Sequence, residues 1–225
     1  MSEQQEWDRV DDYLSDMLVQ SDPALDLALR SSAEAGLPAI NVSPNQGKLL
    51  HLLARMSGAR HILEVGTLGG YSTIWLARAL APGGRLVSLE KIHHHAQIAR
   101  NNIHSAELDD MVDIVVDDAL ASLDRLIADG VEPFDFIFLD ADKENNAAYL
   151  ERALRLSRPG TVIVGDNVVR KGRITHEGNT DPDVLGVRKF LTLMADSPEL
   201  DSTAVQTVGS KGWDGFSLSI VSDRT

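Results

Sequence analysis

From residue 61 onward, short apolar segments alternate with segments of helical periodicity, and this alternation constrains the fold more than any other feature. The apolar segments predict strands at His61–Val65, Arg85–Leu89, Val112–Val116, Phe134–Leu139 and Thr161–Gly165. The segments between them predict helices at Tyr71–Leu80, His94–Ser105, Ala121–Asp129 and Asn145–Leu156. Several strands are apolar almost throughout, as in strands that helices cover on both faces. The pattern therefore predicts an α/β fold built from βαβ units around a mostly parallel, doubly wound sheet.

The last third of the chain has a different pattern. After a polar stretch, a helix is expected at Val184–Ala195, followed by strands at Thr203–Val208 and Phe216–Val221. The short glycine-containing connection between these strands suits a hairpin. We therefore expect seven strands in all, with an antiparallel strand at one edge of the sheet.

The first sixty residues are predicted to be helices that precede the sheet. Ser43 and Pro44 mark the start of the third, as N-cap and first helical residue. We expect one domain of residues 1–225, in which residues 1–60 cover the site and residues 61–225 form the cofactor-binding sheet.

Composition excludes several classes of function. The 225 residues include no cysteine, which removes disulfides, thiolate zinc sites and cysteine nucleophiles. The formal net charge of −13 disfavours nucleic acid as a partner, because such binding requires a basic surface. The acidic N-terminus is unlike a signal peptide, and no stretch approaches the ~20 apolar residues of a membrane span. A cytoplasmic protein with no membrane partner is expected.

The segment HILEVGTLGGYSTIWLARAL, residues 61–80, predicts a strand, a glycine-rich turn and a helix. In open α/β sheets, ligands bind where such turns follow the carboxyl ends of strands. Gly66 and Gly70 allow the backbone to approach a ligand closely. The dinucleotide fingerprint fails because Leu68 and Tyr71 stand where it needs glycine.

Two acidic residues narrow the choice of ligand. Glu64 is expected in the turn, facing the cofactor, where it would repel a pyrophosphate and favour a sulfonium or an ammonium group. Glu90 ends the second strand, where a carboxylate can accept hydrogen bonds from ribose hydroxyls. These residues favour S-adenosylmethionine. The alternative is a tight βα turn with two solvated strand-end charges.

Hard oxygen ligands follow the fourth and fifth strands. Asp140 ends the fourth strand, and Asp166 and Asn167 end the fifth. If these strands are neighbours, two carboxylates and an amide oxygen meet at one rim, a set that suits Mg²⁺ or another divalent cation. Lys143 follows Asp140 and is a candidate general base. The alternatives are a polar loop at a helix start and an Asx turn.

Three segments, LEVGTLGGYSTIWLA, FIFLDADKENNAAYL and PGTVIVGDNVV, together resemble the divalent-metal-dependent O-methyltransferases typified by catechol and caffeoyl-CoA O-methyltransferases. The resemblance extends from about residue 40 to the end of the chain. It implies a Rossmann-like methyltransferase fold and a homodimer. The loop at residues 170–185 resembles neither substrate class closely, which leaves the acceptor open.

The resemblance also implies a role for each matching residue. Asp140, Asp166 and Asn167 match the metal ligands; Lys143 matches the base, and Asp140 is assigned to the catalytic and donor-binding sets as well. The donor-binding residues it implies are Val42, Glu64, Gly66, Thr67, Ser72, Glu90, Asp118 and Ala119. Among these, Val42 matches a contact to the methionine part, Glu90 the ribose ligand and Ala119 the adenine side.

The leading hypothesis is Mg²⁺-dependent methyl transfer from S-adenosylmethionine to a hydroxyl of a small vicinal diphenol. The alternatives are a nicotinamide-dependent oxidoreductase, a non-catalytic cofactor-binding module and a metal-independent N-methyltransferase. Three consecutive histidines, His93–His95, cannot converge on one ion and are interpreted as a solvated helix start. Trp75 is expected in the core, whereas Trp213 suits either the acceptor pocket or an edge position.

Overall fold

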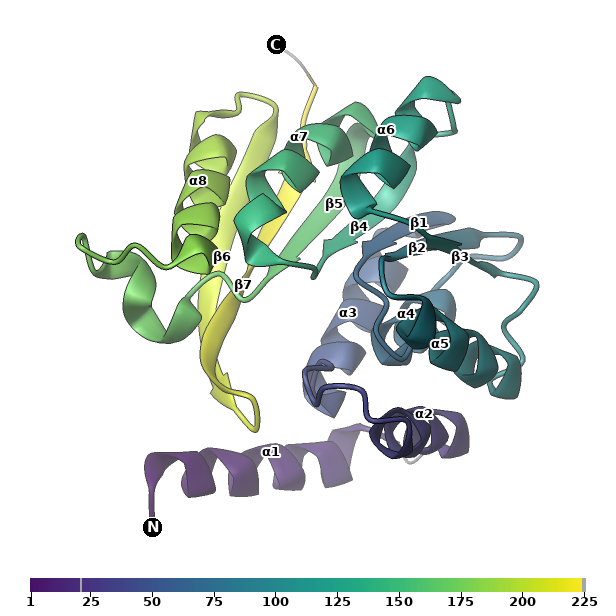
Figure 1. The fold of residues 1–225 in the computed structure, drawn as a ribbon, viewed down its shortest axis with the longest axis vertical. Helices are drawn as coiled ribbons and strands as arrows, with labels where there is room; N and C mark the ends of the chain where they lie inside the picture. The colour runs from purple at the N-terminus through teal and green to yellow at the C-terminus, as the bar shows by residue number, and fades with distance from the viewer. Residues whose placement is uncertain (21, 224–225) are drawn as a thin grey trace.

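The computed structural model describes residues 1–20 and 22–223, and within them seven strands form one sheet (Figure 1). The strands are β1 (His61–Val65), β2 (Arg85–Glu90), β3 (Val112–Val116), β4 (Phe134–Leu139), β5 (Ser157–Asp166), β6 (Leu200–Gly209) and β7 (Gly212–Val221). Their order is β3-β2-β1-β4-β5-β7-β6. The chain runs outward from β1 to β3 and then returns to place β4 on the other side of β1. This reversal makes the β1–β4 pair the topological switch point of the sheet.

The helices are α1 (Glu3–Leu18), α2 (Pro23–Glu34), α3 (Pro44–Met56), α4 (Tyr71–Ala77), α5 (His93–Ser105), α6 (Ala119–Ala128), α7 (Asn146–Arg155) and α8 (Pro182–Asp196). Two 3₁₀ turns, η1 (Lys143–Asn145) and η2 (Arg170–Thr175), follow β4 and β5. Figure 1 shows α1 as a helix apart from the two helical layers, below the tip of the β6–β7 hairpin. No helix in the described part of the chain is long and apolar enough to span a membrane.

Successive strand residues alternate between two apolar cores. Ile62 and Phe136 belong to the core that α3, α4 and α5 cover, whereas Leu63 and Ile137 belong to the core of α6, α7 and α8. Because both faces of the central strands are buried, their sequences are apolar almost throughout. The predicted doubly wound, mostly parallel sheet is confirmed.

The antiparallel strand is β7, which pairs with both β5 and β6. It therefore lies one position in from the edge, and β6 forms the edge itself. The hairpin is longer than its apolar segments suggested, because pairing continues to Gly209 and Gly212 and leaves only Ser210 and Lys211 in the turn.

Helix boundaries differ from the sequence prediction where a cap decides them. Helix α8 begins at Pro182, two residues earlier than expected, because the Asp181 side chain accepts from the Asp183 amide and caps the helix. The helix expected from Asn145 is preceded by the 3₁₀ turn η1. Ser43 caps α3 with Pro44 in its first position, as predicted.

Gly66 occupies a position in the turn that only glycine fits. Its φ of 103° lies in the left-handed region, and a Cβ there would overlap the carbonyl oxygen of Asp140. The turn after β1 therefore touches the backbone at the end of β4. This contact brings two loops of the switch point together.

We expect Gly66→Ala to destabilise the protein more than Gly130→Ala does. Gly130 also has a positive φ, of 62°, but a Cβ there would meet nothing within 4 Å. The control loses about 1 kcal/mol through strain alone, and Gly66→Ala loses at least about 1 kcal/mol more through overlap. Urea unfolding of the two variants measures the difference. Equal losses would contradict the close contact between the two loops.

Candidate functional site

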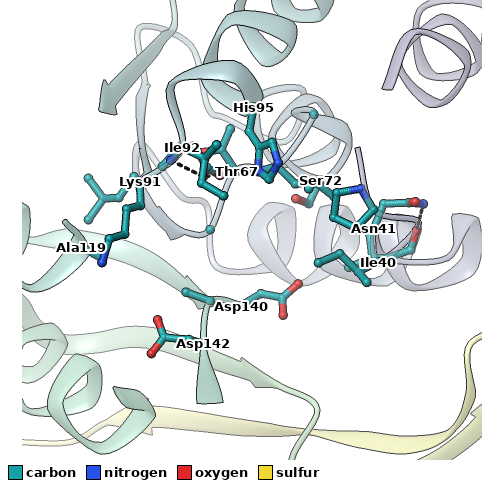
Figure 2. A pocket seen from close by; sticks show the side chains of 18 of the residues that line it. Ile40, Asn41, Thr67, Ser72, Lys91, Ile92, His95, Ala119, Asp140 and Asp142 are labelled. Atoms are coloured by element: carbon teal, nitrogen blue, oxygen red, sulfur yellow. Dashed lines mark hydrogen bonds and ion pairs between the residues drawn. The ribbon is translucent and has the colours of Figure 1, made fainter. Parts of the chain in front are cut away.

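A cavity of about 690 Å³ opens at the carboxyl ends of the parallel strands (Figure 2). Residues from the glycine turn and from the loops after β2, β3, β4 and β5 line it, together with the segment 38–42 that precedes α3. Its volume is in the range of sites that bind small organic molecules. Its place at the switch point is where open α/β sheets bind ligands.

The register of the sheet brings the acidic strand ends together. Val65 of β1 pairs with Leu139 of β4, and Leu139 pairs with Gly165 of β5. Asp140, the first residue after β4, and Asp166, the last residue of β5, therefore lie side by side. The assumption that the fourth and fifth strands are neighbours is confirmed.

Lys143 is a buried amine beside the first of these carboxylates. Its side chain is 7% exposed, and its Nζ lies 2.7 Å from Oδ1 of Asp140. Helix α8 holds η1 in place at Gly186, where a Cβ would overlap the Lys143 carbonyl oxygen. Lys143 and Asp140 both line the cavity, so this ion pair is open to a ligand.

Asp166 is buried next to the cavity, and Asn167 lines it. The backbone amide of Asn167 donates to Oδ1 of Asp166 at 2.8 Å, and the Asn167 backbone has a positive φ of 58°. Burial, together with the negative charge of Asp140, raises the pKa of Asp166 to about 7. Asp140, Asp166 and Asn167 therefore come from the adjacent ends of two paired strands.

Glu90 ends β2 with its carboxylate held from two sides. Its Oε2 accepts from the Leu68 amide at 2.8 Å and its Oε1 from the Ile92 amide at 2.9 Å. The first donor belongs to the glycine turn and the second precedes α5. Glu90 lines the cavity, so the remaining lone pairs of its carboxylate face a ligand.

The structure places Glu64 differently from the sequence prediction. Its side chain lies inside the core, with no exposed surface, and does not face the cavity from the turn. It accepts hydrogen bonds of 2.5 to 2.6 Å from the hydroxyls of Ser72, Thr73 and Ser88. Burial raises its pKa to about 7 despite these three donors. Glu64 therefore reaches the cavity through hydroxyl groups, most directly through Ser72, which lines it.

The other predicted donor-binding residues line the cavity: Val42, Gly66, Thr67, Asp118 and Ala119. Thr67 is linked to Ser88 by a hydroxyl contact of 2.6 Å, so it joins the network around Glu64. Asp118 caps α6 and also contacts Nζ of Lys91 at 3.1 Å. Figure 2 shows Thr67 and Ala119 with Asp140 around the same cavity.

Sequence reasoning missed several residues that line the cavity. Ile40 and Asn41 come from the segment before α3, and Arg170 and Asp183 come from the loop after β5. No local sequence motif identifies these four residues, because they come from segments far apart in the chain that meet only in the folded protein. Tyr149 follows Asp142 by two helical turns and donates to its Oδ1 at 2.5 Å; that spacing was a usable signal.

Two residues set aside in the sequence have clear places. Trp75 is 6% exposed within the core, as expected. The Trp213 ring packs against Gly172 in η2 and donates to Gln206, so it does not line the cavity.

The interpretation of His95 as solvated is wrong: it lines the cavity, whereas His93 and His94 are exposed. Within residues 1–20 and 22–223, no three acidic or histidine side chains are placed to hold a metal.

Comparison with known proteins identifies the family. Residues 16–218 match the family model described as O-methyltransferase. The chain belongs to this family. It is 53% identical over 212 residues to a catechol O-methyltransferase of Mycobacterium tuberculosis, covering 94% of each chain. It is 50% identical to a catechol O-methyltransferase of Niastella koreensis, covering 96% of this chain and 97% of that one.

Solved structures agree with this assignment over the whole fold. The O-methyltransferase from Bacillus cereus in complex with SAH has a TM-score of 0.96 and 55% identity, covering 97% of this chain and 99% of that one. TomG from Streptomyces achromogenes, in complex with SAM, has a TM-score of 0.95 and 47% identity, covering 99% and 100%. The sequence prediction of an S-adenosylmethionine-dependent O-methyltransferase is confirmed.

We expect Glu64→Gln to change how stability depends on pH. The folded protein holds the Glu64 proton up to a pKa of about 7, whereas the ordinary value is 4.5. Its contribution to stability is therefore complete below pH ~4.5 and is lost as pH rises through ~7. Glutamine cannot ionise, so Glu64→Gln should gain stability relative to the parent protein, on the order of 2 kcal/mol, between about pH 5 and pH 8. Urea unfolding across this range measures the difference, and parallel curves would contradict the assigned burial.

Proposed function

We propose that the protein transfers the methyl group of S-adenosylmethionine to one hydroxyl of a small catechol-like acceptor, with a divalent cation, Mg²⁺ by preference, at Asp140, Asp166 and Asn167. The observation that carries this proposal is that the glycine turn, Asp140, Asn167 and the buried amine of Lys143 line one cavity, with Asp166 on the strand paired with β4. Catechol O-methyltransferases that are 50% and 53% identical to the chain support the acceptor class.

The donor would lie along the glycine turn, across the ends of β1 and β2. In this arrangement Glu90 accepts from the ribose hydroxyls, and Asp118 and Ala119 border the adenine. Val42 and Ser72 border the methionine part, and Ser72 is held in position by Glu64. Neighbours that carry SAH or SAM in their structures support this use of the cavity.

The oxygen donors fit a hard divalent cation. Two carboxylates and an amide oxygen are the ligand types that Mg²⁺ prefers, and they come from two paired strands. The buried Asp166 and the neighbouring Asp140 repel each other, and a cation between them would remove that repulsion. When bound, such a cation lowers the pKa of an acceptor hydroxyl and fixes its position.

Proton removal is assigned to Lys143. Its Nζ lies 2.7 Å from Oδ1 of Asp140, and Lys143 lines the cavity. In its neutral form this amine can take the proton that the acceptor hydroxyl loses as its oxygen forms the bond to the methyl group. The carbon–sulfur bond breaks in the same step and leaves S-adenosylhomocysteine. Asp140 positions the amine, and the burial of Lys143 limits the access of water to it.

The rival functions differ in what they require. A non-catalytic module would bind the donor without turnover, and a metal-independent N-methyltransferase would act on amines in the presence of a chelator. The dinucleotide-dependent oxidoreductase has no support now that the family is known.

We infer a single domain, a cytoplasmic location and a homodimer. An exposed apolar row on α1, comprising Val10, Tyr13, Leu14, Met17 and Leu18, is a surface that a second copy can cover.

Chelation should abolish turnover of a diphenol. With catechol and S-adenosylmethionine as substrates, we expect EDTA to lower the rate at least ~100-fold and excess Mg²⁺ to restore it. Asp166→Asn should show a similar loss and weaker Mg²⁺ binding by calorimetry, whereas Asp201→Asn on the exposed strand β6 serves as the matched control. Equal rates with Mg²⁺ and with EDTA would show that the metal assignment is wrong.

Replacing Lys143 should affect the chemical step more than binding. We expect Lys143→Met to lower kcat by roughly 10²- to 10⁴-fold, as for loss of a general base, while its affinity for S-adenosylhomocysteine stays within about threefold. Lys189→Met, at an exposed position on α8, is the control. Steady-state kinetics and calorimetry separate the two effects. Retained kcat in Lys143→Met would assign the proton to another group.

A further inference from the structure

Three consecutive histidines begin α5, and only one of them faces the cavity. His93 and His94 are exposed, and a ring nitrogen of His94 lies 3.0 Å from the Ala35 carbonyl oxygen. The His95 side chain is 14% exposed and lines the cavity. Figure 2 shows its imidazole on the Thr67 and Ile92 side, across from Asp140 and Asp142. Successive helical residues point in different directions, so this difference follows from α5 itself.

His95 lies beside Glu90 without being bonded to it. Its Nδ1 is 3.6 Å from Oε1 of Glu90, which is longer than a hydrogen bond. Within the described residues, the imidazole of His95 has no hydrogen-bond partner. The Glu90 carboxylate, in contrast, is fixed by the amides of Leu68 and Ile92. The pair therefore presents a fixed acceptor and a free imidazole to the same part of the cavity.

A ribose hydroxyl needs both kinds of partner. It donates one hydrogen bond and retains lone pairs that accept others. An ionised carboxylate can only accept, so Glu90 satisfies the donor role of the hydroxyl and leaves its oxygen without a donor. An imidazole N–H supplies that donor. The nearby Lys91 is already engaged with Asp118.

We propose that His95 is a donor-binding residue, which works with Glu90 to bind the ribose hydroxyls of S-adenosylmethionine. The inference rests on the proposed function, because it requires the nucleoside part of the methyl donor at Glu90. His95 closes the ribose side of the cavity and selects for a nucleoside that carries the hydroxyls. It takes no part in the proton transfer at Lys143.

Calorimetry with S-adenosylhomocysteine and with its analogue lacking both ribose hydroxyls tests this role. The full-length parent protein is compared with His95→Phe, which keeps a ring but no nitrogen, and with His95→Ala. His93→Phe makes the same change two residues earlier in the helix, at an exposed position. Thermal unfolding of each variant confirms that it is folded, and the alanine variant answers the question if the phenylalanine variant does not fold.

We expect both His95 variants to bind S-adenosylhomocysteine roughly three- to tenfold more weakly than the parent, as for loss of one hydrogen bond. His93→Phe should bind like the parent, and the analogue without hydroxyls should bind parent and His95 variants alike. A loss that is the same for both ligands, or the same in His93→Phe, overturns the role of His95. A parent protein that binds neither ligand overturns the proposed function, and the inference with it.

Discussion

Three parallel strands end within one residue of the same level of the sheet, and the candidate site depends on this alignment. Val65, Leu139 and Gly165 are paired across β1, β4 and β5, so the residues that follow them lie side by side. The hydrogen-bonded register of these parallel strands fixes the alignment. The oxygen donors, the buried amine and the glycine turn consequently share one cavity.

The buried carboxyl of Glu64 holds the residues next to the cavity in position through hydrogen bonds. Three hydroxyls, from α4 and from β2, converge on it, and Ser72 extends the network to the cavity surface. A charged carboxylate at this depth is unfavourable, which is why its pKa rises towards neutrality. The protein thus keeps an ionisable group in its core, and Ser72, one of the hydroxyls it orders, lies beside the proposed donor site.

Most of the sheet was predictable because buried strands and amphipathic helices have distinct periods. The strands β1, β3 and β4 have the bounds expected from their apolar segments. The predictions were less accurate where pairing with a neighbour, not local composition, decides the element, as in the extension of β6 and β7. The His95 side chain shows the same limit: three adjacent histidines look equivalent in the sequence, and only the orientation of α5 separates them.

The sequence by itself determined the order of strands and helices, the glycine turn and the positions of the acidic residues, because these depend on residue type and short-range spacing. Tertiary structure alone decided which strands are neighbours and which side chains face the cavity. It turned Glu64 into the core, brought Ile40 and Asn41 to the cavity wall and set His95 beside Glu90. These outcomes rest on contacts between segments far apart in the chain, whose packing no local pattern encodes.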